Sequence, residues 1–167
     1  FTTIHNNVVI GDGTWIGSNV TIMEGARIGK NCNIFPGAVI SAIPQDLKFA
    51  GEVTTTEIGD NTTIRECATI NRGTSDKQKT VIGKNCLIMA YVHVAHDCII
   101  GDNCIFANGA TLAGHVECAD FVVVGGLTPI HQFCKIGTQV MIGGASAVAQ
   151  DIPPFCLAEG NKAVLRG

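Results

Sequence analysis

Apolar residues recur every six positions along most of the chain. Between residues 82 and 148 every sixth residue is apolar, namely Ile82, Ile88, Val94, Ile100, Phe106, Leu112, Cys118, Val124, Ile130, Ile136, Ile142 and Val148. The N-terminal part keeps the same period, at Ile4, Ile10, Ile16, Ile22, Ile28, Ile34 and Ile40. Neither a helix, which repeats near 3.6 residues, nor a strand, which repeats at 2, explains this spacing. A period of six predicts a parallel β-helix, a solenoid of short strands and turns.

Each hexad has a second inward position, four residues after the first, which holds smaller side chains. These are Val92, Cys98, Cys104, Ala110, Val116, Val122, Thr128, Cys134, Val140 and Ser146. Three hexads would close one triangular coil, so residues 18 apart should stack at the inter-strand spacing of about 4.8 Å. We therefore predict an all-β fold in which sequence positions 18 apart become neighbours.

Two polar segments interrupt the repeat, at 41–57 and 71–80, and neither can fill a core. We expect both to protrude as loops, the place on a rigid framework where binding residues tend to lie; tolerated insertions are the alternative. After Val148 the repeat dissolves, and Pro153 and Pro154 end the strand run because proline removes a ladder donor. We interpret residues 1–167 as one β-helix core that lacks its first coils, because no capping element precedes the repeat.

Composition narrows the class of protein. The 167 residues are 46% hydrophobic and 15% charged, with a formal net charge of −3. No apolar run approaches the roughly 18 residues that cross a bilayer. No basic patch supports nucleic-acid binding. We expect neither a membrane span nor a nucleic-acid partner.

The eight cysteines follow the repeat rather than a metal-binding spacing. Five of them occupy the small inward position, namely Cys32, Cys86, Cys98, Cys104 and Cys134, and Cys118 occupies the large one. No CxxC pair occurs. Buried free cysteine behaves as a small hydrophobic residue, and unpaired thiols fit a reducing compartment. We predict core packing, with redox or metal chemistry as the alternative.

Histidines gather where residues 18 apart stack. His96 should lie on Gly114, and Gly114 on Gln132; His115 and His131 each lie one residue from this line. Three imidazoles would thus fall near one corner of three successive coils. Such a group is hard to explain as separate solvated side chains.

Two kinds of chemistry fit the histidines. His93 lies three residues before His96, and Asp97 follows His96 directly. Three imidazoles can hold a zinc ion that activates water. A histidine can also act as a general base, because its side chain ordinarily titrates near pH 6.5, and Asp97 could orient it. Spacing alone does not decide between the two.

Several motifs together resemble one family. They are Gln45-Asp-Leu-Lys48, Gly51-Glu52, Ile70-Asn-Arg-Gly-Thr74, His93-Val-Ala-His-Asp-Cys98, Thr111-Leu-Ala-Gly-His-Val116, His131-Gln-Phe-Cys134, Val148-Ala-Gln-Asp-Ile-Pro-Pro154 and Gly160-Asn161. In this order they closely resemble the UDP-N-acetylglucosamine O-acyltransferases of lipid A biosynthesis. The likeness covers essentially the whole chain, whereas hexapeptide repeats alone are shared by many acyltransferases.

The resemblance implies a left-handed β-helix, an exception to the right-handed crossover rule, assembled as a cytoplasmic homotrimer. It implies transfer of an (R)-3-hydroxyacyl group from acyl carrier protein to the 3-position of UDP-N-acetylglucosamine, the first step of lipid A biosynthesis. Neither a cofactor nor a metal is implied. From the resemblance we expect a C-terminal helical domain in the family that residues 1–167 do not include.

The resemblance also assigns site residues. His96 matches the general base, Asp97 its partner, and the Gly114 amide the donor to the developing oxyanion. The family's residues that contact the sugar and the acyl group correspond to Asp46, His115 and Gln132. Its residues near the phosphates and the acyl-pantetheine arm correspond to Lys48, His93 and His131. The family position whose side chain sets the length of the acyl chain corresponds to Gly144.

The chain departs from the family pattern at Asn71 and Lys162, where histidine is common. The contact that Asn71 makes in the substrate cleft should therefore differ from the one that histidine makes in the family. Two other functions remain as alternatives: a γ-type carbonic anhydrase, which shares this architecture and binds zinc through three histidines, and a solenoid without catalysis. The first lacks its family's pair of histidines five apart, and the second leaves the histidine group unexplained.

Overall fold

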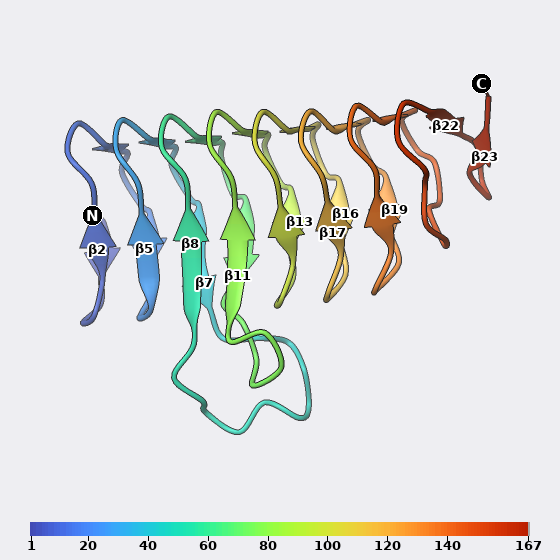
Figure 1. The fold of residues 1–167 in the computed structure, drawn as a ribbon. Helices are drawn as coiled ribbons and strands as arrows, with labels where there is room; N and C mark the ends of the chain where they lie inside the picture. The colour runs from blue at the N-terminus through green and yellow to red at the C-terminus, as the bar shows by residue number, and fades with distance from the viewer. Residues whose placement is uncertain (167) are drawn as a thin grey trace.

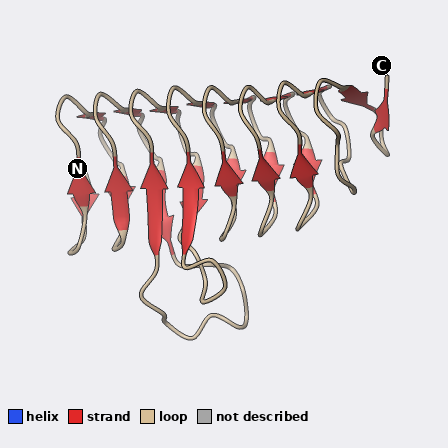
Figure 2. Cartoon of the chain, in the orientation of Figure 1, coloured by secondary structure: helices blue, strands red, loops and turns tan. Residues whose placement is uncertain are grey.

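The computed structural model describes residues 1–166, which form a single stack of three-sided coils (Figure 1). Within that range the regular structure is all strand, as Figure 2 shows. The first sheet contains β1 (Thr3–Ile4), β4 (Thr21–Ile22), β7 (Val39–Ala42), β10 (Thr69–Asn71), β13 (His93–Val94), β16 (Thr111–Leu112) and β19 (Pro129–Ile130). The second contains β2 (Val9–Ile10), β5 (Ala26–Ile28), β8 (Thr55–Ile58), β11 (Lys79–Ile82), β14 (Ile99–Ile100), β17 (Glu117–Cys118) and β20 (Lys135–Ile136). The third contains β3 (Trp15–Ile16), β6 (Asn33–Ile34), β9 (Thr63–Ile64), β12 (Leu87–Ile88), β15 (Ile105–Phe106), β18 (Val123–Val124), β21 (Met141–Ile142), β22 (Leu157–Glu159) and β23 (Val164–Leu165).

The coil is left-handed. In Figure 1 the chain runs upward through the near strands such as β2 and β5, crosses the top to the far side, and advances from left to right. From β1 to β21 consecutive strands belong to different sheets, and each strand up to β18 pairs with the third strand after it. The predicted all-β, left-handed parallel β-helix is confirmed.

Residues 18 apart pair wherever the coil is uninterrupted. Ile4 pairs with Ile22, and Val94 pairs with Leu112, which in turn pairs with Ile130. Both predicted inward positions are buried in all the central coils. At the N-terminal end Ile4 is 51% exposed, because within the described residues no coil covers it on that side.

The inward cysteines form part of this core. The six at predicted inward positions are all buried and free, as expected: Cys32, Cys86, Cys98, Cys104, Cys118 and Cys134. Burial raises the pKa of Cys98 to about 12. A thiol with such a pKa is neutral at physiological pH and is not a ready nucleophile, so Cys98 serves packing.

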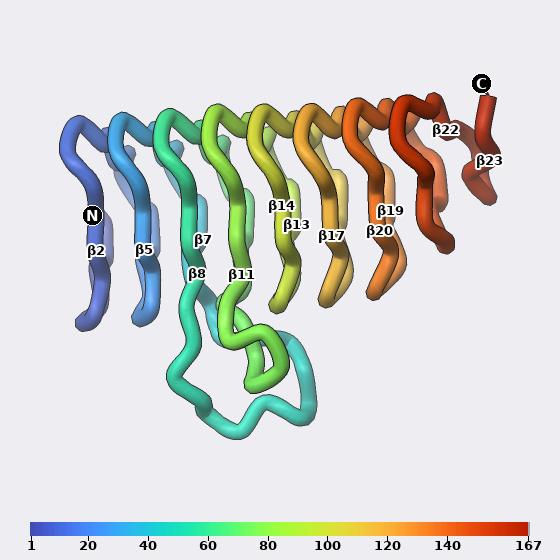
Figure 3. The backbone as a smooth tube through the Cα atoms, in the orientation of Figure 1, coloured from blue at the N-terminus to red at the C-terminus, as the bar shows by residue number. Residues whose placement is uncertain are grey.

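The two interruptions protrude from one side of the stack, as the tube in Figure 3 shows. Both are shorter than predicted, because strand pairing continues into their ends: β7 reaches Ala42, β8 begins at Thr55, and β11 begins at Lys79. The loops proper are therefore 43–54 and 72–78. They contact each other, since the Thr54 hydroxyl donates to the Gly73 carbonyl at 2.6 Å.

Strand pairing also continues beyond the point at which the repeat dissolves. Ile152 forms a parallel bridge with Ile136, and Ala158 of β22 pairs with Ile142, although neither pair keeps the spacing of 18. β23 then pairs antiparallel with β22. Among residues 1–166 no helix could span a membrane.

Candidate functional site

The candidate site lies at the corner that follows the first sheet, beside both loops. Two columns of residues 18 apart stack there. One contains His96, Gly114 and Gln132, as the sequence predicts; the other contains Asp97, His115 and Phe133. Backbone bonds link them, since the His115 amide donates to the His96 carbonyl at 3.0 Å and the Phe133 amide to the Gly114 carbonyl at 3.1 Å.

Residues of the second column have left-handed backbone conformations. The φ angles are 59° at Asp97, 64° at His115 and 66° at Phe133. Positive φ is uncommon for residues other than glycine, and rare for a bulky aromatic. The sharp corner requires it, since residues at other corners of the coil, such as Tyr91 and Phe121, have the same conformation, with a φ of 61° at each.

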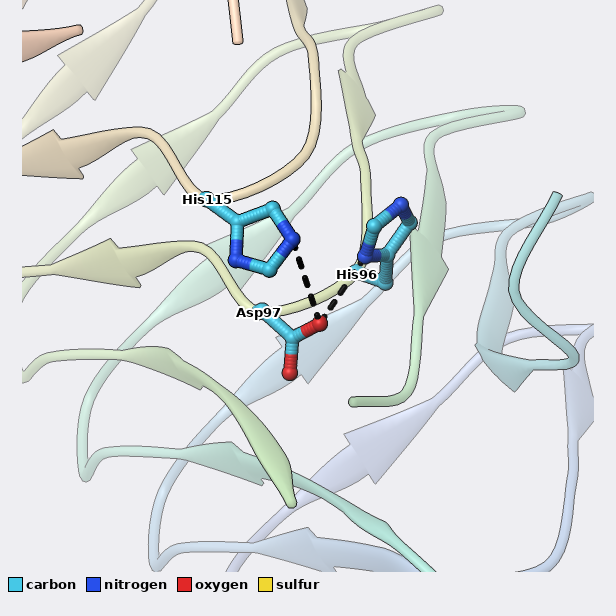
Figure 4. Close-up of side chains that lie close together, drawn as sticks. All are labelled: His96, Asp97 and His115. Atoms are coloured by element: carbon cyan, nitrogen blue, oxygen red, sulfur yellow. Dashed lines mark hydrogen bonds and ion pairs between the residues drawn. The ribbon is translucent and has the colours of Figure 1, made fainter. Parts of the chain in front are cut away.

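His96 and Asp97 form a hydrogen-bonded pair (Figure 4). The Nδ1 atom of His96 lies 2.9 Å from Oδ2 of Asp97. An ionised carboxylate only accepts hydrogen bonds, so the proton of this bond lies on Nδ1. In the neutral imidazole Nε2 then carries the lone pair and can accept a proton.

The Asp97 carboxylate is fully buried and held by four donors. Oδ1 accepts from the Thr74 amide at 3.0 Å and the Lys77 amide at 3.3 Å, and Oδ2 accepts from the Thr74 hydroxyl at 2.6 Å as well as from His96. Burial alone raises the pKa of Asp97, but the hydrogen bonds from Thr74 and His96 and the positive potential of His115 outweigh burial and lower the pKa below its ordinary value. The carboxylate therefore stays ionised and orients His96.

His115 lies across the same carboxylate from His96. Its Nε2 is 3.8 Å from Asp97 Oδ2, and its Nδ1 is 3.3 Å from Oδ2 of Asp76 in the second loop. The two imidazole centroids are 5.1 Å apart and nearly perpendicular. On its other face His115 stacks on Phe133, with centroids 4.5 Å apart and 12° between the planes.

Gly114 leaves the space that the His96 ring occupies. A Cβ atom at Gly114 would lie 2.6 Å from Cε1 and 2.7 Å from Nε2 of His96, far inside contact distance. Among residues 1–166 the Gly114 amide donates to no protein acceptor. The Gly114 backbone, with its free N–H, therefore packs directly against the edge of the His96 ring that carries Cε1 and Nε2.

We expect Gly114→Ala to lower kcat by roughly 10²-fold without unfolding the protein. The backbone at Gly114 accommodates an L side chain, but the new methyl group must displace the His96 ring, and a shift of about 1 Å can cost that much in rate. Steady-state kinetics and the melting temperature of the full-length protein measure the two effects. A folded variant with wild-type kcat would contradict this placement of His96.

A cavity of about 370 Å³ opens between the loops and this corner. Asp46, Lys48 and Glu52 line it from the first loop, Thr74, Ser75 and Asp76 from the second, and His115 and Phe133 from the corner. The fold thus brings the predicted Asp46 and Lys48 to the predicted His115, although they are distant in sequence.

Other predicted residues lie outside this cavity. His93 points outward from β13, and its Nδ1 is 2.7 Å from the Thr69 hydroxyl; burial, then the charge of His96, lowers its pKa. His131 and Gln132 are exposed, and His131 Nδ1 lies 3.1 Å from the Gln132 carbonyl oxygen. Gly144 follows β21 of the third sheet and so lies at a different corner of the coil.

The expected group of three imidazoles is therefore a pair. Within the described part of the chain, the group of three potential metal ligands whose ligating atoms all lie within 4.8 Å of one another consists of His96, Asp97 and His115. The oxygen that would face a metal, Asp97 Oδ2, already accepts two hydrogen bonds, and a cation there would have to replace that of His96. These donors fit an oriented base better than a zinc site.

Sequence reasoning missed the roles of three residues: Thr74, Asp76 and Phe133. Phe133 could have been found, because it lies 18 residues after His115. Thr74 and Asp76 belong to a segment outside the repeat, so no spacing relates them to Asp97.

Comparisons with known proteins agree with this fold. Residues 7–42 and 79–114 match the family model described as bacterial transferase hexapeptide (six repeats). The acyl-[acyl-carrier-protein]–UDP-N-acetylglucosamine O-acyltransferase of Aliarcobacter butzleri is 79% identical over 129 residues, which are 77% of this chain and 50% of the relative. The chain spans about half the length of the curated relatives it matches.

Solved structures match over the full length of the chain. The UDP-N-acetylglucosamine acyltransferase of Francisella novicida has a TM-score of 0.98 and 41% identity, covering 100% of this chain and 62% of that one. The UDP-N-acetylglucosamine acyltransferase of Campylobacter jejuni has a TM-score of 0.88 and 46% identity, covering 99% of this chain and 72% of that one. At this identity and coverage, the chain belongs to the family of UDP-N-acetylglucosamine acyltransferases.

Proposed function

We propose that the protein transfers an (R)-3-hydroxyacyl group from acyl carrier protein to the 3-hydroxyl of UDP-N-acetylglucosamine, the first step of lipid A biosynthesis. The observation that carries the proposal is the His96–Asp97 pair, whose imidazole packs against Gly114. Family membership and the substrates in the relative's name support the choice of donor and acceptor.

His96 acts as the general base. Its Nε2 takes the proton of the acceptor hydroxyl while the oxygen attacks the thioester carbonyl, and the ionised Asp97 stabilises the imidazolium that forms. The C–O bond forms, the C–S bond breaks, and the proton passes from His96 to the leaving thiolate. The residue pair therefore returns to its starting state after each transfer.

The Gly114 amide donates to the carbonyl oxygen as negative charge develops on it. A fixed N–H aimed at such a position is a strong source of transition-state stabilisation. Its nearness to His96 Nε2 suits a reaction in which proton removal and oxyanion formation occur on neighbouring atoms.

The cavity between the loops suits the sugar nucleotide. Asp46 can accept hydrogen bonds from sugar hydroxyls, Lys48 can pair with phosphate, and His115 adjoins the reacting centre. We assign the acyl and pantetheine contacts to Gln132, His93 and His131, and the limit on acyl length to Gly144.

We further propose a cytoplasmic homotrimer. Lys48, His131 and Gln132 are exposed in the single chain, and an apolar groove of about 350 Å³ runs past His131 along β16 and β19. A neighbouring subunit would cover this groove and complete a cleft around the exposed groups.

An acyl-transfer assay of the full-length protein tests the function. We expect an acylated sugar nucleotide, detected by mass spectrometry, only when UDP-N-acetylglucosamine and acyl carrier protein loaded with an (R)-3-hydroxyacyl group are both present. The 3-deoxy analogue, which lacks the attacking oxygen, should give no product. Product from the 3-deoxy analogue, or faster transfer to a 3-amino analogue, would overturn the assignment of the acceptor.

A further inference from the structure

The second loop, 72–78, wraps the buried carboxylate of Asp97. Three of the four donors to this carboxylate belong to it: the Thr74 amide, the Thr74 hydroxyl and the Lys77 amide. Thr74 itself is only 7% exposed. This loop therefore supplies most of the contacts that fix the carboxylate.

Contacts on each side hold the loop in place. The Lys77 ammonium pairs with Glu117 at 2.7 Å, two coils further on, and the Thr54 hydroxyl donates to the Gly73 carbonyl at 2.6 Å. The Gln78 amide donates to the Thr74 carbonyl at 2.8 Å, which closes a turn within the loop. A tolerated insertion would not require these hydrogen bonds and this ion pair, whereas a segment that positions another group does.

Two imidazoles compete for Asp97 Oδ2. His96 Nδ1 is 2.9 Å from this oxygen and His115 Nε2 is 3.8 Å away, as the two dashed lines in Figure 4 show. A carboxylate oxygen has two lone pairs. The Thr74 hydroxyl, at 2.6 Å, takes one of them and leaves the other to His96. Without that hydroxyl, one lone pair of Oδ2 is open to His115, so that His96 loses its exclusive hold on this oxygen.

We propose that Thr74 is a positioning residue for the proposed acyl transfer, holding Asp97 on His96 and away from His115. The inference rests on the proposed function, because it treats His96 as the base. It adds a residue from outside the hexapeptide repeat whose hydroxyl selects which of two histidines the carboxylate orients.

Three variants of the full-length protein test the role of the hydroxyl. Thr74→Val removes the donor at nearly constant volume, and Thr74→Ser keeps it. The control is Thr56→Val, which also removes a buried hydroxyl; Thr56 lies in the strand next to Thr80 and its hydroxyl has no partner in residues 1–166. We expect Thr74→Val to lower kcat roughly 10- to 100-fold, the range for a hydrogen bond to a charged group. KM should change less than about 2-fold.

The spectroscopic readout is the ¹⁵N signal of the His96 ring. We expect the Nδ1-protonated tautomer in the wild type, in Thr74→Ser and in Thr56→Val, and a mixture of tautomers in Thr74→Val. Wild-type kcat together with an unchanged His96 signal in folded Thr74→Val would overturn the inference. If Thr74→Val does not fold, Thr74→Ala replaces it, and equal kcat in the alanine and serine variants would overturn the inference as well.

His96→Ala separates this inference from the function on which it rests. Full activity in His96→Ala refutes the proposed base, whatever Thr74 does. Lost activity in His96→Ala with full activity in Thr74→Val refutes the positioning role alone.

Discussion

The His96→Ala variant of the full-length protein is expected to lose about 10²–10⁴-fold in kcat, the usual contribution of general acid–base catalysis. The substitution removes the only ring whose Nδ1 is hydrogen-bonded to Asp97 within residues 1–166, but it leaves the residues that line the cavity between the loops. Ground-state binding should persist, so KM should change by only a few-fold. Steady-state kinetics with acyl carrier protein substrates measure both.

Cys98→Ala is the matched control for His96→Ala. Cys98 lies two residues away but is fully buried in the coil, and its thiol is neutral because burial raises its pKa to about 12. Its replacement should lower the melting temperature more than the turnover. A folded Cys98→Ala protein without activity, next to an active His96→Ala protein, would indicate a thiol mechanism instead.

Phe106→Ala should destabilise the fold by about 3–5 kcal/mol, the range for removal of a buried phenylalanine. Phe106 of β15 is fully buried and stacks between Ile88 and Val124 in the inward column. The coils on both sides prevent collapse into the space that the ring leaves, so the cavity cost adds to the lost burial. Urea unfolding, evaluated as the free energy of unfolding in water, measures the effect.

Phe121→Ala provides the comparison for Phe106→Ala. Phe121 is 51% exposed at a corner of the coil, so its removal leaves no cavity and should cost well under 1 kcal/mol. Similar losses in the two variants would show that the inward column does not determine stability.

The fold could be predicted from sequence because the repeat relates distant residues by simple arithmetic. The spacing of 18 correctly placed Gly114 on His96, and the period of six correctly placed the inward cysteines in the core. The same arithmetic fails at 43–54 and 72–78, where Ile40 pairs with Ile70 and Ile70 with Val94. Inside these loops no periodicity relates a residue to its neighbours in space, so Thr74 and Asp76 could not be assigned.

The sequence by itself determined the coil, the inward columns and the His96–Gly114–Gln132 stack, because each follows from a period that the backbone must keep. It left open whether the histidines bind a metal or remove a proton. Only the tertiary structure decided which groups meet at Asp97: His115 rather than His131, and Thr74 from a loop outside the repeat. The physical reason is that the direction of a side chain at a corner depends on local φ angles and on the loop folded over it, and neither is encoded in the hydrophobic period.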